Sequence, residues 1–202
     1  ASSTIRSRDG TPLPRPVQIK YLGTTIRGDQ LRTHRSKLPV TARLAEARTA
    51  FAGLQALWKH TRVTRARKLI IYRACVLQKL IYGLYTLVVL DSDYTRLDSF
   101  HIRCLRKILG IPSTYAAKHI LHIPPKSNAD VLKAAQAYPI RVDIDNLRAK
   151  LYAHIYRRSD DHPARQALFA RGSTKAAKWR GSRGRGRPPT AWQSQAHATV
   201  KE

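Results

Sequence analysis

The sequence predicts a mainly α protein: a helical bundle preceded by a short β-hairpin and followed by a disordered basic tail. Three observations support this. Between residues 40 and 158, apolar residues recur every three or four positions, the period of a helix with one buried face. Val17, Ile19 and Tyr21 alternate with polar residues instead, as in a strand. From residue 172 onward the chain is rich in Gly, Arg and Lys, and it has too few apolar residues to offset its ordering entropy.

The N-terminal segment is expected to be extended. Strands are predicted over Ser3–Arg8 and Val17–Ile26, and they flank a loop with the turn signal Asp9-Gly10. Gly23 permits a turn or a close backbone approach. Because a strand pair without a larger sheet is marginal in water, this hairpin needs support from elsewhere.

Residues 40–60 are expected to form the first helix. Arg43, Glu46 and Arg48 mark its polar face, and its apolar face consists of Val40, Leu44, Ala47, Phe51, Leu54, Leu57 and Trp58. A more buried helix is expected over residues 64–90, with Thr64 as a candidate cap. Gly83 inside it costs about 1 kcal/mol relative to alanine, so close packing or a bend is expected there.

The third expected helix, residues 93–109, has the clearest pattern. Ser92 stands where a cap belongs, Asp91 and Asp93 lie near the positive helix end, and Gly110 with Pro112 stops the run. The apolar stripe consists of Leu97, Phe100, Cys104, Leu105 and Ile108, and the other faces carry Arg96, His101, Arg103, Arg106 and Lys107.

The C-terminal half is expected to be less regular. Residues 110–127 are predicted to be a linker, and a short helix to about Ala137 is capped by Ser127 or Asn128. After Pro139 a further helix is expected from about Asp143 to Arg158, with the stripe Ile144, Leu147, Leu151 and Ile155. The predicted units are residues 1–30, 31–111, 112–171 and 172–202.

The net charge of +26, from 38 Lys and Arg against 12 Asp and Glu, indicates a polyanionic partner, because so large a charge repels itself in a compact fold. Nucleic acid is the expected partner. A membrane surface is the rival, but the basic residues do not form one amphipathic helix with a bulky apolar face. The longest apolar run, Leu80–Leu90, is far shorter than the roughly 20 residues of a membrane span.

No catalytic or metal site is predicted in this chain. The close acid pairs Asp91/Asp93, Asp143/Asp145 and Asp160/Asp161 all flank helix ends, where the helix dipole accounts for them. His119 and His122 have no cysteine pair nearby, so a zinc site is not expected. Cys75 and Cys104 both fall on apolar stripes and are expected to be small core side chains.

Several short motifs occur in a characteristic order. They are Tyr21-Leu22-Gly23, Leu80-Ile81-Tyr82-Gly83, the string Y-x-x-L-D-x-F-H-x-R-C-L-R-x-I-L-G-I at residues 94–111, Asn128-Ala129-Asp130-Val131-Leu132, residues 151–158, and Gly186-Arg187-Pro188 followed by Trp192. Together they resemble the region after the polymerase core in reverse transcriptases of non-LTR (LINE-like) retrotransposons. Ala153 replaces the glycine usual in that family.

This resemblance implies that residues 1–30 are the end of a palm with its primer-grip hairpin, residues 31–111 a helical thumb, and residues 112–171 a post-thumb extension. The metal-binding carboxylates of the family lie upstream of this region. The resemblance therefore implies no catalysis and no cofactor for this chain alone. The parent would be an RNA-directed DNA polymerase that needs Mg²⁺, and its palm and fingers would be partners. It also implies a nuclear location, or a cytoplasmic ribonucleoprotein.

The expected nucleic acid is an RNA–DNA hybrid, RNA or DNA, held through its phosphates. The resemblance implies that the primer is gripped by Lys20, Tyr21, Leu22 and Gly23. The alternative is that these residues form an ordinary turn beside the core. Arg62, Arg65, Arg67 and Lys68 cluster at a helix start, and Arg103, Arg106 and Lys107 form a second patch. The alternative for both patches is solvated surface charge.

The tail contains a second motif for nucleic acid. Arg183, Arg185 and Arg187 alternate with glycines before Pro188 and resemble the AT-hook core, which lies in the narrow minor groove of A·T-rich DNA. This supports an alternative function, a non-enzymatic DNA-binding protein. Sequence-independent contact with nucleic acid and nuclear targeting are further alternatives for the tail.

Overall fold

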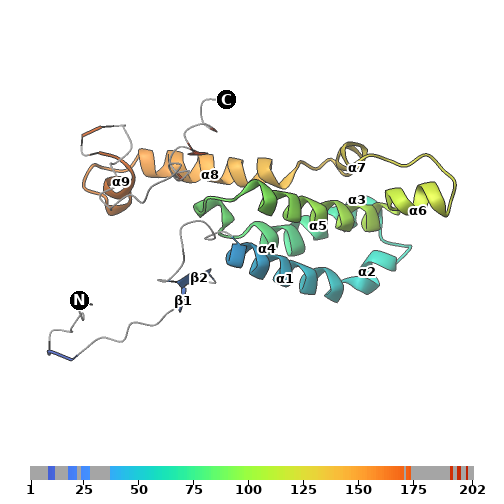
Figure 1. Cartoon of the computed structure of the whole chain (residues 1–202), viewed down its shortest axis with the longest axis horizontal. Coiled ribbons are helices and arrows are strands. Elements are labelled where there is room, and N and C mark those ends of the chain that lie inside the picture. The colour runs from blue at the N-terminus through green and yellow to red at the C-terminus, as the bar shows by residue number, and fades with distance from the viewer. Residues whose placement is uncertain are drawn as a thin grey trace.

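The computed structural model describes residues 9–11, 18–21, 24–27, 37–170, 172–173, 192, 195–196 and 199. This part of the chain is mainly helical, as predicted. Figure 1 shows the long helices α1 (Lys37–Gly53), α5 (Asp91–Leu109) and α8 (Ile140–Tyr156) lying along the long axis of the molecule. Among the described residues, no helix has the length and apolar character needed to cross a membrane.

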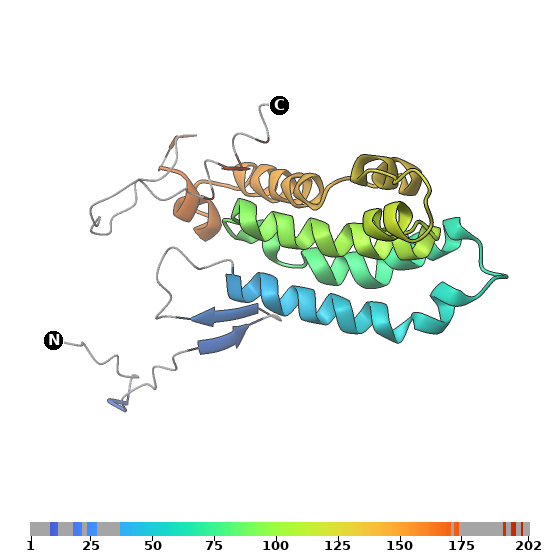
Figure 2. The same ribbon diagram turned by 45° about the vertical axis from the view of Figure 1, so that its right-hand side comes forward.

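Two short strands precede the helices. β1 (Gln18–Tyr21) pairs antiparallel with β2 (Thr24–Arg27), with Ile19 opposite Ile26. The segment expected to be a single strand is thus divided in two (Figure 2). The other predicted strand, Ser3–Arg8, lies outside the described residues.

The predicted first helix is divided into α1 and α2 (Gln55–Lys59). Its apolar stripe is confirmed, because Val40, Leu44, Ala47 and Trp58 are buried. Arg43 was expected on the polar face and is buried instead. Its guanidinium pairs with Glu46 at 2.7 Å and lies over the ring of Tyr82, which satisfies its charge inside the fold.

The predicted helix over residues 64–90 is wrong beyond residue 81. The Thr64 hydroxyl accepts a hydrogen bond from the Arg67 N–H at 3.4 Å and starts α3 (Arg65–Tyr72). The helix continues through a π-helical turn, Arg73–Leu77, and α4 (Gln78–Ile81). It ends because Gly83 adopts a φ of +73°, a left-handed conformation incompatible with a helix. A 3₁₀ turn, Leu84–Thr86, follows.

α5 confirms the apolar stripe of the third predicted helix, since Leu97, Phe100, Cys104, Leu105 and Ile108 are all buried. Gly110 ends the helix with a φ of +69°. The expected cap is wrong: Leu90 precedes the helix without a side-chain bond, and Ser92 lies within the first turn. His101 and Arg106, expected on outer faces, are buried.

The segment predicted as a linker contains a helix, α6 (Thr114–His119), whose first turn is capped by Ser113. Ser127, rather than Asn128, caps α7 (Asn128–Ala135). α8 begins three residues before its expected start, because a carboxylate oxygen of Asp98 accepts the Ile140 N–H at 2.8 Å. A short helix, α9 (Pro163–Leu168), follows.

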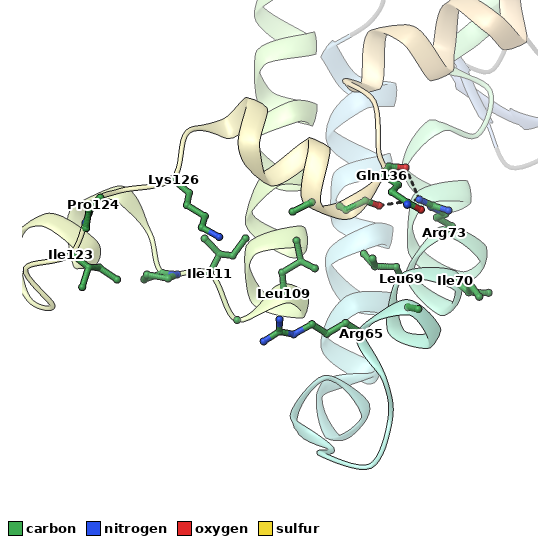
Figure 3. A pocket seen from close by; sticks show the side chains of 15 residues that line it. Arg65, Leu69, Ile70, Arg73, Leu109, Ile111, Ile123, Pro124, Lys126 and Gln136 are labelled. Carbon is green, nitrogen blue, oxygen red and sulfur yellow. Dashed lines mark hydrogen bonds between the residues drawn. The ribbon is translucent and has the colours of Figure 1, made fainter.

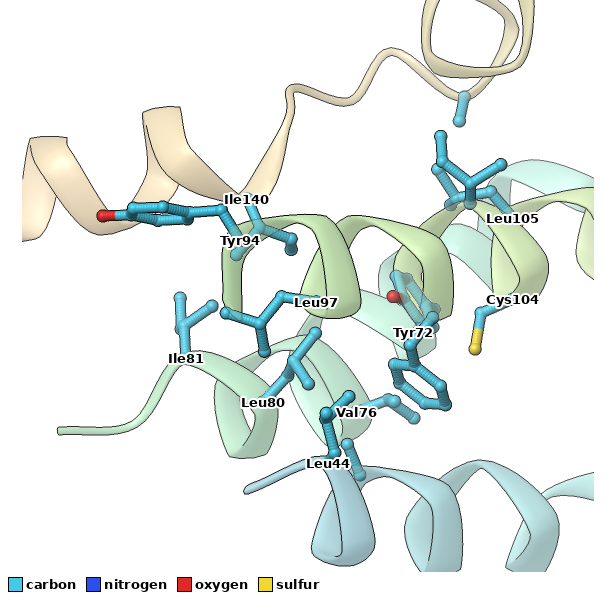
Figure 4. Close-up of a cluster of buried hydrophobic side chains, with 14 of the residues drawn as sticks. Leu44, Tyr72, Val76, Leu80, Ile81, Tyr94, Leu97, Cys104, Leu105 and Ile140 are labelled. Atoms are coloured by element: carbon cyan, nitrogen blue, oxygen red, sulfur yellow. The ribbon is translucent and has the colours of Figure 1, made fainter. Parts of the chain in front are cut away.

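One apolar core joins these elements. α1 and α5 run parallel, and the α3–α4 segment packs against both in the opposite direction (Figure 2). Figure 4 shows Leu44 of α1, Val76 and Leu80 of the middle segment, and Leu97 of α5 pointing toward one another. Val131, Ala135, Ile140 and Ile144 extend this core onto α7 and α8. The division of the chain at residue 111 stays a prediction.

A second, smaller cluster forms at the far end of α8. It consists of Tyr152, Ile155, Phe169 and Ala196, with Trp192 packed against it. The indole N–H of Trp192 donates to the Tyr85 carbonyl at 2.7 Å. Trp192 and Ala196 are thus packed against the bundle, and the prediction of a disordered tail is not confirmed. Residues 174–191 lie outside the described part.

Candidate nucleic-acid interface

The two predicted basic patches meet at one end of the bundle. The Lys107 ammonium of α5 donates to the Gln55 side chain of α2 at 2.8 Å. A Cβ placed on Gly110 would lie 3.9 Å from the Arg65 guanidinium of α3. These contacts bring α2, the start of α3 and the end of α5 together, although the patches lie some 40 residues apart in the sequence.

We call the exposed cations of the two predicted patches the basic end. They are Arg62, Arg65, Arg67, Arg103 and Lys107. Among the described residues, none of these five cations forms an ion pair with an Asp or Glu. The ion pairs of the described part are made by other arginines. The sequence explains this: no Asp or Glu occurs between Glu46 and Asp91, or between Asp98 and Asp130. No acid of the described part of the chain therefore neutralises the charge of the basic end.

Two predicted phosphate contacts are corrected by the structure. The Lys68 ammonium is buried and donates to the Trp58 carbonyl at 2.8 Å. The Arg106 guanidinium is buried and donates to the carbonyls of Pro112 and Lys126, at 2.8 and 2.7 Å, and to Asn128. Both cations bind oxygens of the protein itself, because a buried charge must be hydrogen-bonded.

Lys59 of α2 and Arg48 of α1 are exposed cations that were not among the predicted residues. The seam between α1 and α5 is marked by the bond from Arg96 to Thr41, at 3.0 Å, and it continues in the bond from Lys107 to Gln55 of α2. Arg48 follows Thr41 by seven residues, and seven residues return to the same helix face. Arg48 is exposed and therefore adds to the basic end along this seam. The sequence alone could not assign Arg48 to this surface, because the assignment requires knowing that α1 packs against α5.

Asp130, the first acid that follows the basic end in the sequence, is hydrogen-bonded within its own helix cap. The Asp130 carboxylate accepts bonds from the Ser127 hydroxyl and N–H at 2.7 and 3.0 Å. The bond from the Ser127 hydroxyl lowers the pKa of Asp130 most, and the bond from the Ser127 N–H lowers it further. It remains an anion that caps α7 and does not pair with the arginines of α3.

The acids predicted to have no catalytic role lie at helix ends. Asp93 is buried and pairs with Arg96 at 3.0 Å, and Asp91 pairs with Arg141. Within the described ranges, no group of three or more His, Cys, Asp and Glu residues could hold a metal ion. Cys104 is a core side chain, and burial raises the pKa of its thiol to about 12. Cys75, also predicted in the core, is exposed instead, on the outer face of the π-helical turn.

The remaining predicted residues are less fully described. The structure gives the backbone of Lys20 and Tyr21 at the end of β1. Leu22 and Gly23, between the strands, lie outside the described residues. So do Arg183, Arg185 and Arg187. Their roles stay predictions.

Comparison with models of protein families, with curated proteins and with solved structures finds no match to this chain.

Proposed function

We propose that this chain binds a nucleic-acid duplex through its phosphates, as the thumb-like part of a reverse transcriptase of the non-LTR retrotransposon type. The observation that carries the proposal is the basic end, where five exposed cations are held on packed helices and on the turn between α2 and α3, without an acidic partner among the described residues. The ordered motifs between Tyr21 and Trp192 support the choice of family.

The mechanism is positional and electrostatic. Arg65 and Arg67 extend from the start of α3, and Arg103 extends from α5, so their spacing is set by helix packing. Cations fixed in this way follow a phosphate backbone and recognise its shape rather than its sequence. In this proposal an RNA–DNA hybrid is the native ligand. The metal-dependent polymerisation and the nuclear location belong to the parent enzyme.

A charge-reversal experiment tests the proposal. The triple variant Arg65→Glu, Arg67→Glu and Arg103→Glu should weaken binding to a hybrid duplex by at least about tenfold. It should also flatten the dependence of log K on log salt by roughly 0.7–0.9 for each phosphate that the variant no longer neutralises. Fluorescence anisotropy across a salt series gives both quantities.

The matched control changes the same number of charges elsewhere. Lys150→Glu, Arg157→Glu and Arg158→Glu lie on or just after the C-terminal half of α8, away from the basic end. This variant should retain most of the affinity. Equal reductions in affinity from both triples would mean that net charge alone drives binding, and the thumb-like assignment would be rejected.

The AT-hook alternative makes a different prediction for the same assay. If the tail were the binding element, replacing Arg183, Arg185 and Arg187 by serine would abolish binding, and the chain would prefer A·T-rich DNA duplex. Serine replacement is a cleaner test than deleting residues 172–202, because deletion also removes Trp192 and its hydrogen bond to Tyr85.

A further inference from the structure

A groove opens beside the basic end, between α3, the end of α5 and the segment that leads into α7 (Figure 3). It encloses about 680 Å³, within the range typical of small-ligand sites. Leu69, Leu109 and Ile111 form an apolar floor, and Ile70 and Ile123 stand on its walls. Both wall side chains are largely exposed, at 62% and 45%.

The rim of the groove is cationic. Arg65, Arg73 and Lys126 line it together, and no Asp or Glu is among its lining residues. Arg73 is held in place because its guanidinium donates to the carbonyls of Ala135 and Gln136 at 3.0 and 2.6 Å. Arg65 and Lys126 have no such anchor for their charged groups among the described residues, so both can turn toward an anion in the groove.

We propose that this groove takes one unpaired nucleotide of a bound strand, with its base on the apolar floor and its phosphate between Arg65 and Lys126. This inference rests on the proposed function. A nucleotide combines a flat apolar face with an adjacent anion, which is the combination that the floor and the rim offer. A purely apolar ligand would leave the cations unused, and an inorganic anion would leave the floor uncovered.

The position of Arg65 links the groove to the duplex surface. Arg65 belongs to the basic end and also lines the groove. A strand whose phosphates follow the basic end therefore passes the mouth of the groove. A bulged base at that point can leave the stack and lie against Ile70 and Leu69, as bases extruded from a duplex do in apolar pockets.

The test compares two RNA–DNA hybrids of equal length, one fully paired and one with a single bulged 2-aminopurine. The groove is lined by aliphatic side chains, so the gain comes from burying the apolar face of the base, and the full chain should bind the bulged hybrid at least about fivefold more tightly. The 2-aminopurine fluorescence should rise on binding, because the base leaves its stacked neighbours for an aliphatic surface.

Matched variants locate the effect. Ile70→Glu places an anion on the groove wall, and Ile120→Glu makes the same change at an exposed position (64%) that does not line the groove. The preference for the bulged hybrid should disappear in Ile70→Glu and persist in Ile120→Glu. Circular dichroism checks that both variants are folded, as expected for exposed side chains.

The outcomes separate the two proposals. Absence of salt-dependent hybrid binding would overturn the proposed function. Binding of both hybrids with equal affinity and unchanged fluorescence would overturn only the groove assignment. Loss of the preference in both variants would also overturn it, since the effect would not be local. Concentration-dependent self-association that only Ile70→Glu abolishes, without a bulge effect, would assign the groove to a second copy of this chain.

Discussion

Within the described part of the chain, four buried cations bind oxygen atoms of the protein itself: Arg43, Lys68, Arg106 and Arg148. Arg148 is only 2% exposed; its guanidinium pairs with Asp145 and donates to the Leu87 carbonyl at 3.2 Å. Removing one partner from such a site leaves a buried group unsatisfied, which costs more than the bond itself contributes. At these positions, then, the positive charge is satisfied inside the fold and is not available to a ligand.

His101 makes the stability of the fold depend on pH. Its Nδ1 lies 2.8 Å from the Tyr72 hydroxyl, and burial lowers the pKa of His101 from 6.5 to about 4. The unfolded chain therefore takes up this proton at a higher pH than the folded chain does. The contribution of the neutral His101 side chain to the free energy of unfolding is complete above pH 6.5 and is lost as the pH falls toward 4.

We expect this histidine to lower the free energy of unfolding by roughly 2 kcal/mol between pH 7 and pH 5. Urea unfolding of the natural chain and of His101→Phe at both pH values measures the effect. The variant should be less stable at pH 7, because the Tyr72 hydroxyl loses its partner, but it should lack this part of the pH dependence. Parallel pH profiles for the two proteins would contradict the assignment.

At the scale of elements, two glycines near the basic end should respond oppositely to alanine. Gly110 ends α5 with a φ of +69°, and its nearest neighbour would stay 3.9 Å from a new Cβ, so Gly110→Ala costs backbone strain of roughly 1 kcal/mol without a clash. Gly53 lies in α1 with open space around it, so Gly53→Ala should stabilise by about 0.5–1 kcal/mol. Thermal unfolding measures both, and shifts of the same sign would contradict the backbone argument.

The elements that the sequence predicted well are those determined by local physics. The stripe of α5 and the caps Thr64 and Ser127 depend on residues within one or two helical turns. The errors have distant causes. Asp98 starts α8 from a position 42 residues earlier. Gly83 was recognised as a weak point, but whether a helix bends or ends there is decided by the packing on either side.

The candidate site divides in the same way. Arg65, Arg67 and Arg103 were predicted as exposed cations and are exposed. Lys68 is adjacent to Arg67 in the sequence, yet it is buried because the carbonyl of Trp58 accepts its ammonium. Arg48 joins the surface only through the pairing of α1 with α5. Residue type indicated the charge, and tertiary contacts decided which charges face solvent.

At the scale of the whole molecule, Trp192 connects the C-terminal region to the bundle. Its ring lies 6.5 Å from that of Tyr152, and its N–H bonds to the Tyr85 carbonyl. Trp192→Ala should lower the free energy of unfolding by roughly 2 kcal/mol, less than for a fully buried tryptophan. Chemical denaturation of the full chain measures this, with serine at Arg183, Arg185 and Arg187 as the control. A Trp192→Ala protein as stable as the control would show that this contact contributes little.

The bond between Trp192 and Tyr85 joins residues 107 positions apart. During synthesis, Tyr85 leaves the ribosome long before Trp192 has been made. The α1–α5 core can form early from neighbouring segments, since closing short loops costs little entropy. Tyr152 and Phe169, by contrast, remain without their tryptophan until Trp192 has been translated. Until then the nascent chain exposes apolar side chains at this end of α8, and a chain that ended before Trp192 would keep them exposed.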